Sequence, residues 1–186
     1  MKINFRGIGA KLALAFGLLM VMSTVSFLLA RGAFETYKHQ NETFIPKIRK
    51  TIDEATLASS DSKTMAVECL NYIVTKDEAH AEAKLKADEE AGAHFETVAN
   101  LVKELPNNET LVKLNDSFAG LDEKVCNPLE NKIIAQARKG DLKGAQDVFE
   151  KEYIPQRAEL EKRIQAFQDE LLQYSKNAVA ATNKAA

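Results

Sequence analysis

Three histidines are the residues of this sequence best suited to hold a metal ion, but their spacing predicts no metal centre. His39 and His94 follow Glu35 and Glu90 by four residues, whereas His80 stands apart. A four-residue spacing puts both side chains on one face of a helix. Two ligands make a weak site, because structural metal sites use four. We expect the histidines to lie on solvated helix surface, with no metal or other cofactor bound.

Two cysteines, Cys69 and Cys126, are the only sulfur nucleophiles, and no Cys-x-x-Cys-His sequence that would attach a haem occurs. On the helices expected for this chain, the two differ in height by about 10 Å, more than the usual Cα separation of a disulfide. Buried thiols that pack as small apolar groups are therefore favoured. A disulfide remains the alternative, since a kink at Pro128 would bring the two closer.

Composition argues against an enzyme and against a nucleic-acid partner. No nucleophile–base–acid set, glycine-rich phosphate loop or pair of facing carboxylates is evident in the sequence. The net charge is −2, and residues 1–34 hold four bases and no acid, so residues 35–186 carry −6. A nucleic-acid binder needs a basic face, which such an acidic region does not offer.

The chain is predicted to be all-α. It has only 8 glycines and 4 prolines, too few for the turns of a strand-rich fold. Apolar residues recur in steps of three and four, which is the packing period of helical bundles. The two clearest seams consist of Leu160, Ile164, Phe167, Leu171, Tyr174, Ala178 and Ala181, and of Leu111, Leu114, Phe118, Leu121, Val125, Leu129 and Ile133.

Short polar segments divide the helical pattern. Thr75 and Glu78 have the spacing of a capping box, and Asn108 follows a proline turn at the expected start of another helix. Gly140 suits a helix C-terminus, and Asp141 suits the N-cap of the next helix.

Pro128 and Pro155 fall inside apolar patterns and are expected to kink helices rather than end them. Four helices result, which an up-down-up-down antiparallel bundle would accommodate. They are expected at residues 31–74, 77–105, 108–139 and 141–184.

Residues 12–30 contain no charge and are long enough to cross a bilayer as a helix. Basic residues precede this stretch and only Arg31 follows it closely, so residues 1–11 are expected in the cytoplasm. Residues 31–186 then form a periplasmic bundle on the inner membrane. A cleaved signal peptide is the competing interpretation. It is disfavoured because the stretch exceeds 15 residues and lacks a small residue three positions before either candidate cleavage site.

With these features the chain resembles the N-terminal sensory region of bacterial methyl-accepting chemotaxis receptors of the four-helix-bundle type. Three stretches carry the resemblance: residues 8–16 at the membrane entry, 70–77 at the first hairpin, and 137–141 with Ala145 and 153–155 at the second. Such receptors continue into a second span, a HAMP linker and a cytoplasmic signalling coiled coil. This cytoplasmic signalling half is absent from the 186 residues.

The resemblance implies a homodimer that binds a small ligand, such as a carboxylate or an amino acid, and transmits its occupancy by displacement of the last helix. Ligands of these receptors sit near the distal end, between the first and last helices across the dimer. The positions of this chain at that depth are Lys63, Thr64, Asn71, Lys151, Gln156 and Arg157. A cationic pocket for a carboxylate is one interpretation of them, and exposed helix charges are the other.

Two further functions stay open. Related bundles serve as sensor domains of histidine kinases and of diguanylate cyclases. A single-span bundle with an acidic surface could also act as an interaction protein without any signalling output. The sequence names neither the ligand nor the output domain.

Overall fold

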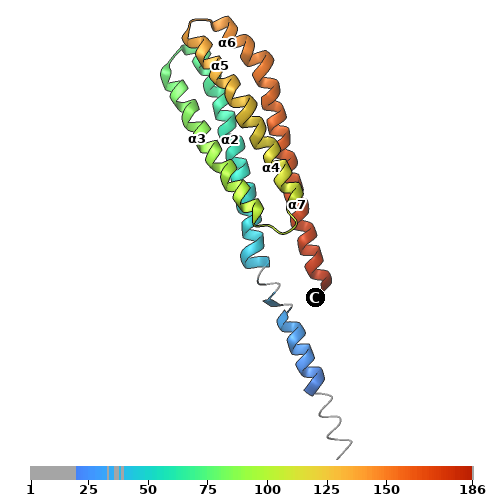
Figure 1. Cartoon of the computed structure of the whole chain (residues 1–186). Coiled ribbons are helices and arrows are strands. Elements are labelled where there is room, and N and C mark those ends of the chain that lie inside the picture. The colour runs from blue at the N-terminus through green and yellow to red at the C-terminus, as the bar shows by residue number, and fades with distance from the viewer. Residues whose placement is uncertain (1–19, 33, 36–37, 39, 186) are drawn as a thin grey trace, which may run out of the picture. The chain divides into compact units, whose positions relative to one another are not determined.

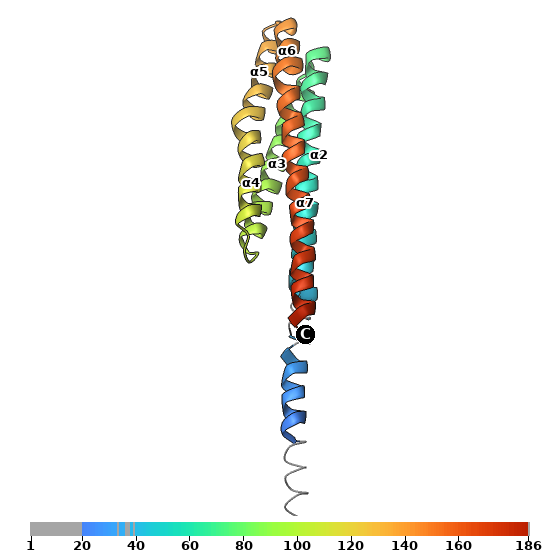
Figure 2. The ribbon, with the colours of Figure 1, turned by 90° about the vertical axis from the view of Figure 1, so that its right-hand side faces the viewer.

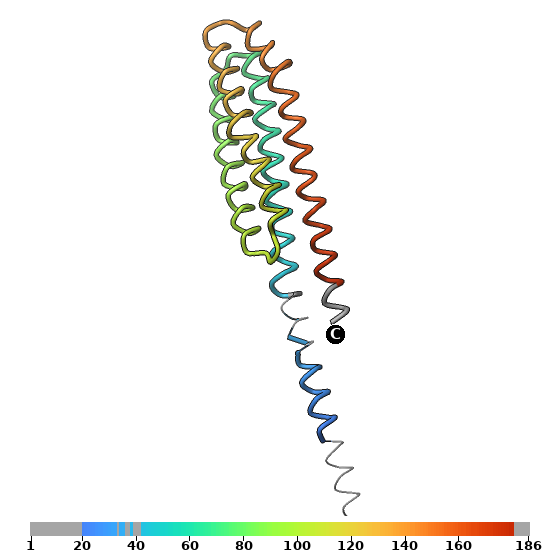
Figure 3. Tube along the Cα trace, turned by 45° about the vertical axis from the view of Figure 1, so that its right-hand side comes forward, coloured from blue at the N-terminus to red at the C-terminus, as the bar shows by residue number. Residues whose placement is uncertain are grey.

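The computed structural model describes residues 20–32, 34–35, 38 and 40–185, and every regular element among them is helical. Residues 46–175 form a compact unit in which four antiparallel helical rods lie side by side (Figures 1 and 3). The prediction of an all-α four-helix bundle is therefore confirmed. The rods are α2 (Ile45–Thr75); α3 (Glu78–Lys103); α4 (Glu109–Leu121) with the π-helical segment η2 (Asp122–Cys126) and α5 (Asn127–Arg138); and α6 (Leu142–Val148) with the π-helical segment η3 (Phe149–Tyr153) and α7 (Ile154–Ala185).

The N-terminal part is described only in pieces. Residues 20–32 are helical, with exposed apolar side chains such as Phe27 and Leu29, and a π-helical segment η1 (Gln40–Phe44) precedes α2. Among the residues described, no helix combines the length and apolar character that crossing a membrane requires. The first eight residues of the span predicted at 12–30 lie outside the described residues.

Each helix boundary between the rods falls within two residues of its prediction, but two of the predicted caps work differently. The N-cap of α3 is Asp77, whose Oδ1 accepts from the Ala79 amide at 3.0 Å. The Thr75 hydroxyl instead donates to the Asn71 carbonyl. Asn108 makes no side-chain capping bond to α4; its Nδ2 donates to the Val102 carbonyl and so holds the end of α3.

The predicted turn at Gly140 and Asp141 is confirmed. Gly140 has φ +84°, a left-handed conformation that glycine adopts without steric cost. The Asp141 carboxylate then caps α6 by accepting from the Gly144 amide at 2.9 Å. This pair ends one rod and starts the next within three residues.

An ionic contact joins three rods at the end of the bundle that carries this turn. Arg138, the last residue of α5, donates through Nε to Glu78 of α3 at 3.1 Å, and the Tyr72 hydroxyl of α2 donates to the same carboxylate at 2.6 Å. The guanidinium also lies over the Tyr72 ring. Hydrogen bonds from Arg138 and Tyr72 lower the pKa of Glu78 to about 2.

The middle of the core is a row of three phenylalanines from three rods. The Phe118 ring centroid lies 5.3 Å from that of Phe95 and 5.3 Å from that of Phe167, the second pair edge-on at 73°. Phe118 and Phe167 are completely buried. Their predicted burial in the two seams is thus confirmed.

The seam of the third rod departs from the prediction at Leu114, which is half-buried while Asn115 is buried, and again after Leu121. The sequence pattern continues inward through Val125 and Leu129, but these two are only half-buried, and Cys126 and Glu130 take the inward positions. The reason is η2, because a π-helical turn inserts an extra residue and rotates everything after it. The bulge therefore places a carboxylate, Glu130, in the interior of the bundle.

Candidate functional site

Two helix bulges, η2 and η3, mark a region in which the bundle departs from regular α-helical geometry. Pro128 and Pro155 follow η2 and η3 and lie inside continuous rods, as predicted. Proline has no amide hydrogen, so the carbonyls of Lys124 and Lys151 cannot accept the α-helical hydrogen bond. The chain accommodates each proline with a π-helical segment, a feature frequently found at functional sites.

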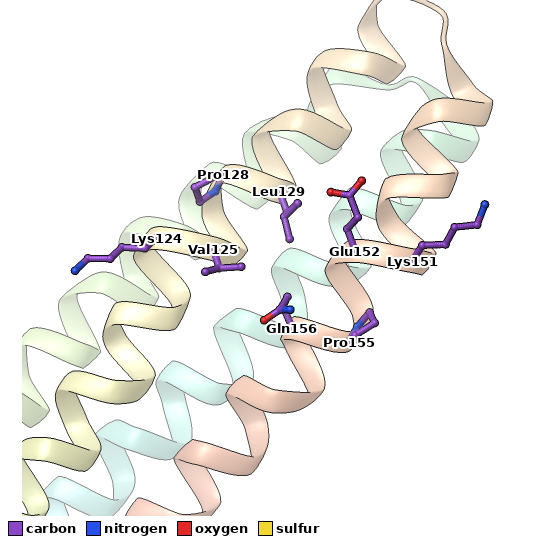
Figure 4. A pocket seen from close by; sticks show the side chains of 8 residues that line it. All are labelled: Lys124, Val125, Pro128, Leu129, Lys151, Glu152, Pro155 and Gln156. Atoms are coloured by element: carbon purple, nitrogen blue, oxygen red, sulfur yellow. The ribbon is translucent and has the colours of Figure 1, made fainter.

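A surface groove of about 490 Å³ lies between the bulged parts of the third and fourth rods. Figure 4 shows Val125, Leu129 and Gln156 directed toward the space between the two helices, whereas the Lys124 and Lys151 side chains extend away from it. The lining residues are Lys124, Val125, Pro128, Leu129, Lys151, Glu152, Pro155 and Gln156.

Ion pairs already occupy charged groups around this groove. Lys132 of α5 donates to both oxygens of Glu152 at 3.0 Å, and this pair joins the two walls. Lys151 donates to Asp147 at 2.6 Å, one turn earlier on its own rod. Val125 and Leu129 contribute apolar surface to the groove, and the Gln156 amide is a polar group directed into it.

On the inner side of the same bulges lies a buried ionic cluster. Lys84 of α3 is 3 % exposed, and its Nζ lies 2.9 Å from Glu130 Oε2 and 3.0 Å from Asp88 Oδ2. Glu130 is completely buried, and its Oε1 accepts from the Tyr153 hydroxyl at 2.7 Å. Burial by itself lowers the pKa of Lys84, but Glu130 and Asp88 outweigh it and hold that pKa above its ordinary value. Lys84 is therefore charged.

Two further buried groups of this cluster have unused hydrogen-bonding atoms. Asp122, the first residue of η2, is 4 % exposed and its Oδ1 has no partner. Arg157 of α7 is 5 % exposed; one of its nitrogens donates to the Ser59 carbonyl at 3.5 Å, while Nε and Nη1 have no partner. Burial, and secondarily the negative charge of Glu130, raise the pKa of Asp122 to about 7, and Arg157 opposes the shift.

Both cysteines are completely buried free thiols beside this cluster, so the favoured interpretation of them is confirmed. Burial, with the negative charge of Glu130, raises the pKa of Cys69. Burial and Asp122 raise the pKa of Cys126 to about 12. Neither thiol is activated as a nucleophile.

The three predicted ligand-binding residues of α2 lie on its outer side and do not reach the groove. Lys63 Nζ is 3.6 Å from Glu161 of α7, and both side chains are exposed. The Thr64 hydroxyl donates to the Ser60 carbonyl of its own helix, and Asn71 is half-buried.

The three predicted residues of the fourth rod have separate surroundings. Lys151 and Gln156 line the groove, whereas Arg157 points into the interior and contacts the Ser59 carbonyl. The structure therefore brings Lys151 and Gln156 to one groove and places the other four predicted positions elsewhere.

The expectation that the histidines lie on solvated surface is wrong for the two that are described. His94 Nδ1 lies 2.6 Å from Glu54 Oε2, and Nε2 lies 3.6 Å from Asp61, both on α2. His80 Nδ1 lies 2.6 Å from Glu68 Oε2, also on α2. These half-buried pairs tie α3 to α2.

The partner of His94 is thus on the neighbouring helix, and the sequence argument that paired it with Glu90 on its own helix missed this contact. His39 lies outside the described residues. Among the residues that are described, no group of three or more potential ligands could hold a metal ion.

The family comparison gives the context for this geometry. The profile of a family described as "four helix bundle sensory module for signal transduction" matches residues 4–186. The chain belongs to this family. No curated protein and no solved structure matches it. The protein is therefore a four-helix-bundle sensory module of chemotaxis-type signal transduction, and its family is a sensory rather than an enzymatic one.

Sequence reasoning missed the ionic cluster of this module because it assigned charged residues to the surface. One signal was present: Lys84 shares the spacing of the buried stripe of α3, which runs through Ala81, Ala87, Ala91 and Phe95. A charge in such a stripe requires a buried partner, but the partner's position depends on the bulge in another rod.

Proposed function

We propose that this module is the periplasmic ligand-binding domain of a chemotaxis receptor, anchored in the inner membrane by residues 12–30 with residues 1–11 in the cytoplasm. The observation that carries the proposal is the family match, which runs from residue 4 through the bundle to residue 186. The uncharged stretch and the basic residues before it support this orientation.

The groove is the proposed site of the ligand. It is lined by Lys151 and Gln156, two of the six residues expected from the sequence, and by the apolar side chains of Val125 and Leu129. A small ligand with an apolar body can pack on Val125 and Leu129, and its carboxylate or amino group can bond to the Gln156 amide, which is directed into the groove. Binding in such a groove is favoured where a few polar groups converge on an apolar floor.

Transmission requires that the ligand bind one arrangement of the fourth rod more tightly than another. The wall residues of this rod lie in η3 and at the start of α7, so a ligand bridging both walls acts directly on α7. The π-helical turn supplies a point at which the register of the rod can change without breaking the rod. Displacement of α7 is therefore the proposed output.

The test joins residues 1–186 to the signalling half of a well-characterised chemotaxis receptor and measures kinase activity in membranes against a panel of amino acids and organic acids. A ligand-dependent change that Val125→Trp abolishes supports the groove. The matched control is Leu85→Trp, at an exposed apolar position on α3. No response to any compound with the parent chain, or a response that survives Val125→Trp, contradicts ligand sensing through this groove.

The alternatives differ in the domain that comes after the module. A histidine kinase or diguanylate cyclase domain encoded after Ala186 would identify one of the other outputs, and a second span with a HAMP linker would identify the chemotaxis receptor. A stop codon in the gene at that point would favour a membrane-anchored interaction protein.

We also propose that the module acts as a homodimer through the outer side of α2. Exposed side chains recur there in steps of three and four, the spacing of a helix–helix seam. The stripe consists of the exposed residues Leu57, Ser60, Thr64, Val67 and Val74, with the half-buried Asn71 between the last two. Its apolar members are unusually exposed for a helix in a core-forming bundle, at 47 % for Leu57 and 74 % for Val74.

The α2–α7 contacts delimit this stripe on one side. Gln168 Nε2 donates to the Thr56 hydroxyl at 3.0 Å, and the Lys63–Glu161 pair lies two turns further along both helices, which run side by side (Figure 2). Pairing two α2 stripes would bury the apolar residues that α7 leaves uncovered.

Single cysteines test the dimer in membranes, in a background without Cys69 and Cys126. Residues introduced at positions 57, 64, 67 and 74 should crosslink between chains, whereas position 66, on a half-buried face, should not. Equal crosslinking at all positions, or none, would contradict the α2 interface.

A further inference from the structure

Among the carboxylates of the buried ionic cluster, Asp122 is the one that neither accepts a described hydrogen bond nor lies within ion-pair distance of a cation. Glu130 accepts from Tyr153 and lies 2.9 Å from the Lys84 ammonium, and Asp88 lies 3.0 Å from the same ammonium. Asp122 is buried to the same degree as Lys84, but its Oδ1 has no partner. Of the three acids around this cluster, Asp122 is the one whose negative charge is least stabilised.

The charges that face Asp122 come from three rods. They are Lys84 and Asp88 of α3, Glu130 of α5 and Arg157 of α7. With all groups ionised, two cations face three carboxylates, of which Asp88 is partly exposed and Asp122 and Glu130 are buried, so the cluster carries one excess negative charge. Neutral but titratable neighbours complete the surroundings: Cys69 of α2, Cys126 of η2 and Tyr153 of η3 are all completely buried, and their thiols and hydroxyl stay protonated because burial raises their pKa values.

An excess buried charge is removed most simply by a proton, and the proton goes to the carboxylate that has no donors of its own. We propose that the bundle interior binds one proton at the Asp122 carboxylate, so that pH is a second stimulus of this module in addition to the ligand of the groove. The proposal adds a stimulus to the sensory function and does not depend on the identity of the ligand.

The Asp122 carboxyl titrates near neutral pH. Burial raises the pKa of Asp122 to about 7, with Glu130 adding to the shift and Arg157 opposing it. Below this pH the group is a neutral acid, and above it the group is a buried anion. Modest changes around neutral pH therefore change the charge of the interior.

The position of Asp122 couples this charge to the rod that transmits the signal. Asp122 is the first residue of η2, whose Lys124 and Val125 line one wall of the groove. Arg157 of α7 directly follows Gln156 of the opposite wall and has two nitrogens without partners. Loss of the proton strengthens the attraction between η2 and α7 across the interior, and gain of the proton weakens it.

Infrared titration of the full chain tests the proton site directly, because protonated carboxyl groups absorb separately from carboxylates. With aspartate labelled by carbon-13, one aspartic acid should remain protonated at pH 6 and lose its proton with a midpoint near 7. That signal should vanish in Asp122→Asn and persist in Asp116→Asn, a matched change at an exposed position of α4. Absence of such a signal in the parent chain overturns the proposal without any variant having to fold.

Stability provides the second measurement. Folding raises the pKa of Asp122 from 3.8 to about 7. Raising the pH from 5 to 8 should therefore lower the folding equilibrium constant of the parent, relative to that of Asp122→Asn, by close to 100-fold. Equal pH dependence of the two chains would contradict the site.

The receptor hybrid separates this proposal from the proposed function. A pH response of the kinase that disappears in Asp122→Asn while the ligand response remains supports proton sensing. A ligand response with no pH response in the parent refutes proton sensing alone. If no compound elicits a response but the infrared signal is present, the ligand-sensing function fails and the proton site stands.

Discussion

Replacing Phe118 by alanine should destabilise the bundle more than any other single truncation of the aromatic row, because Phe118 is its central member. It is completely buried and contacts Phe95 and Phe167, both at 5.3 Å between ring centroids. Phe95 and Phe167 each have a described ring contact only with Phe118, so truncating either removes one ring contact rather than two.

The magnitude follows from burial. A buried phenylalanine removes about 150 Å² from water, which at about 25 cal/mol per Å² corresponds to nearly 4 kcal/mol. Alanine retains a small part of that area, whereas loss of two ring contacts adds about 0.5–1.5 kcal/mol each. A loss of about 4 kcal/mol agrees with measured costs of such truncations. For a bundle of this size it corresponds to a fall in Tm of about 10–15 °C.

Urea and thermal unfolding of the full chain, followed by circular dichroism in one detergent buffer, measure this loss. The matched control is Leu85→Ala on the exposed face of α3, where 56 % of the residue is exposed, and its stability should change by less than about 0.5 kcal/mol. In the double variant Phe118→Ala/Phe167→Ala, the loss should fall short of the sum of the single losses by about 0.5–1.5 kcal/mol. A Phe118→Ala Tm within two degrees of the parent would refute the assignment of this row as the core.

Two further predictions concern the ionic cluster and the orientation of the chain. Lys84→Met should lower the free energy of unfolding, measured in urea, by about 3–5 kcal/mol, because it leaves the Glu130 carboxylate buried without its cation. The double variant Lys84→Met/Glu130→Leu should recover most of that loss. A double variant as unstable as the single one would show that the ion pair itself stabilises the bundle. Protease added to intact spheroplasts should degrade residues 31–186 and spare a tag at the N-terminus; a degraded tag would reverse the proposed topology, and a mature chain beginning after residue 30 would show that the span is cleaved.

The sequence alone determined where the rods begin and end, because those signals are local. Gly140 provides a left-handed residue, and Asp141 has its amide partner three residues away. The inward positions of Phe118 and Phe167 were equally predictable, since steps of three and four repeat along an uninterrupted helix. Family membership followed from the order and spacing of the same signals.

The interior of the bulged region was decided by tertiary structure. The two prolines were recognised as kinks, but whether a helix absorbs a proline by bending or by adding a π-helical turn depends on what packs around it. That choice exchanged Val125 and Leu129 for Cys126 and Glu130 at the inward positions. It also created the groove on the outer side of the same turn.

The partners of the buried charged side chains were likewise decided by tertiary structure. Lys84 and Glu130 are 46 positions apart, and His94 and Glu54 are 40 apart, so no helix period connects them. The residue type of a charged side chain does not indicate whether it faces water or a buried partner. Only the packing of one rod against another determines which partner it meets, because the free energy of a buried charge depends on groups contributed by other helices.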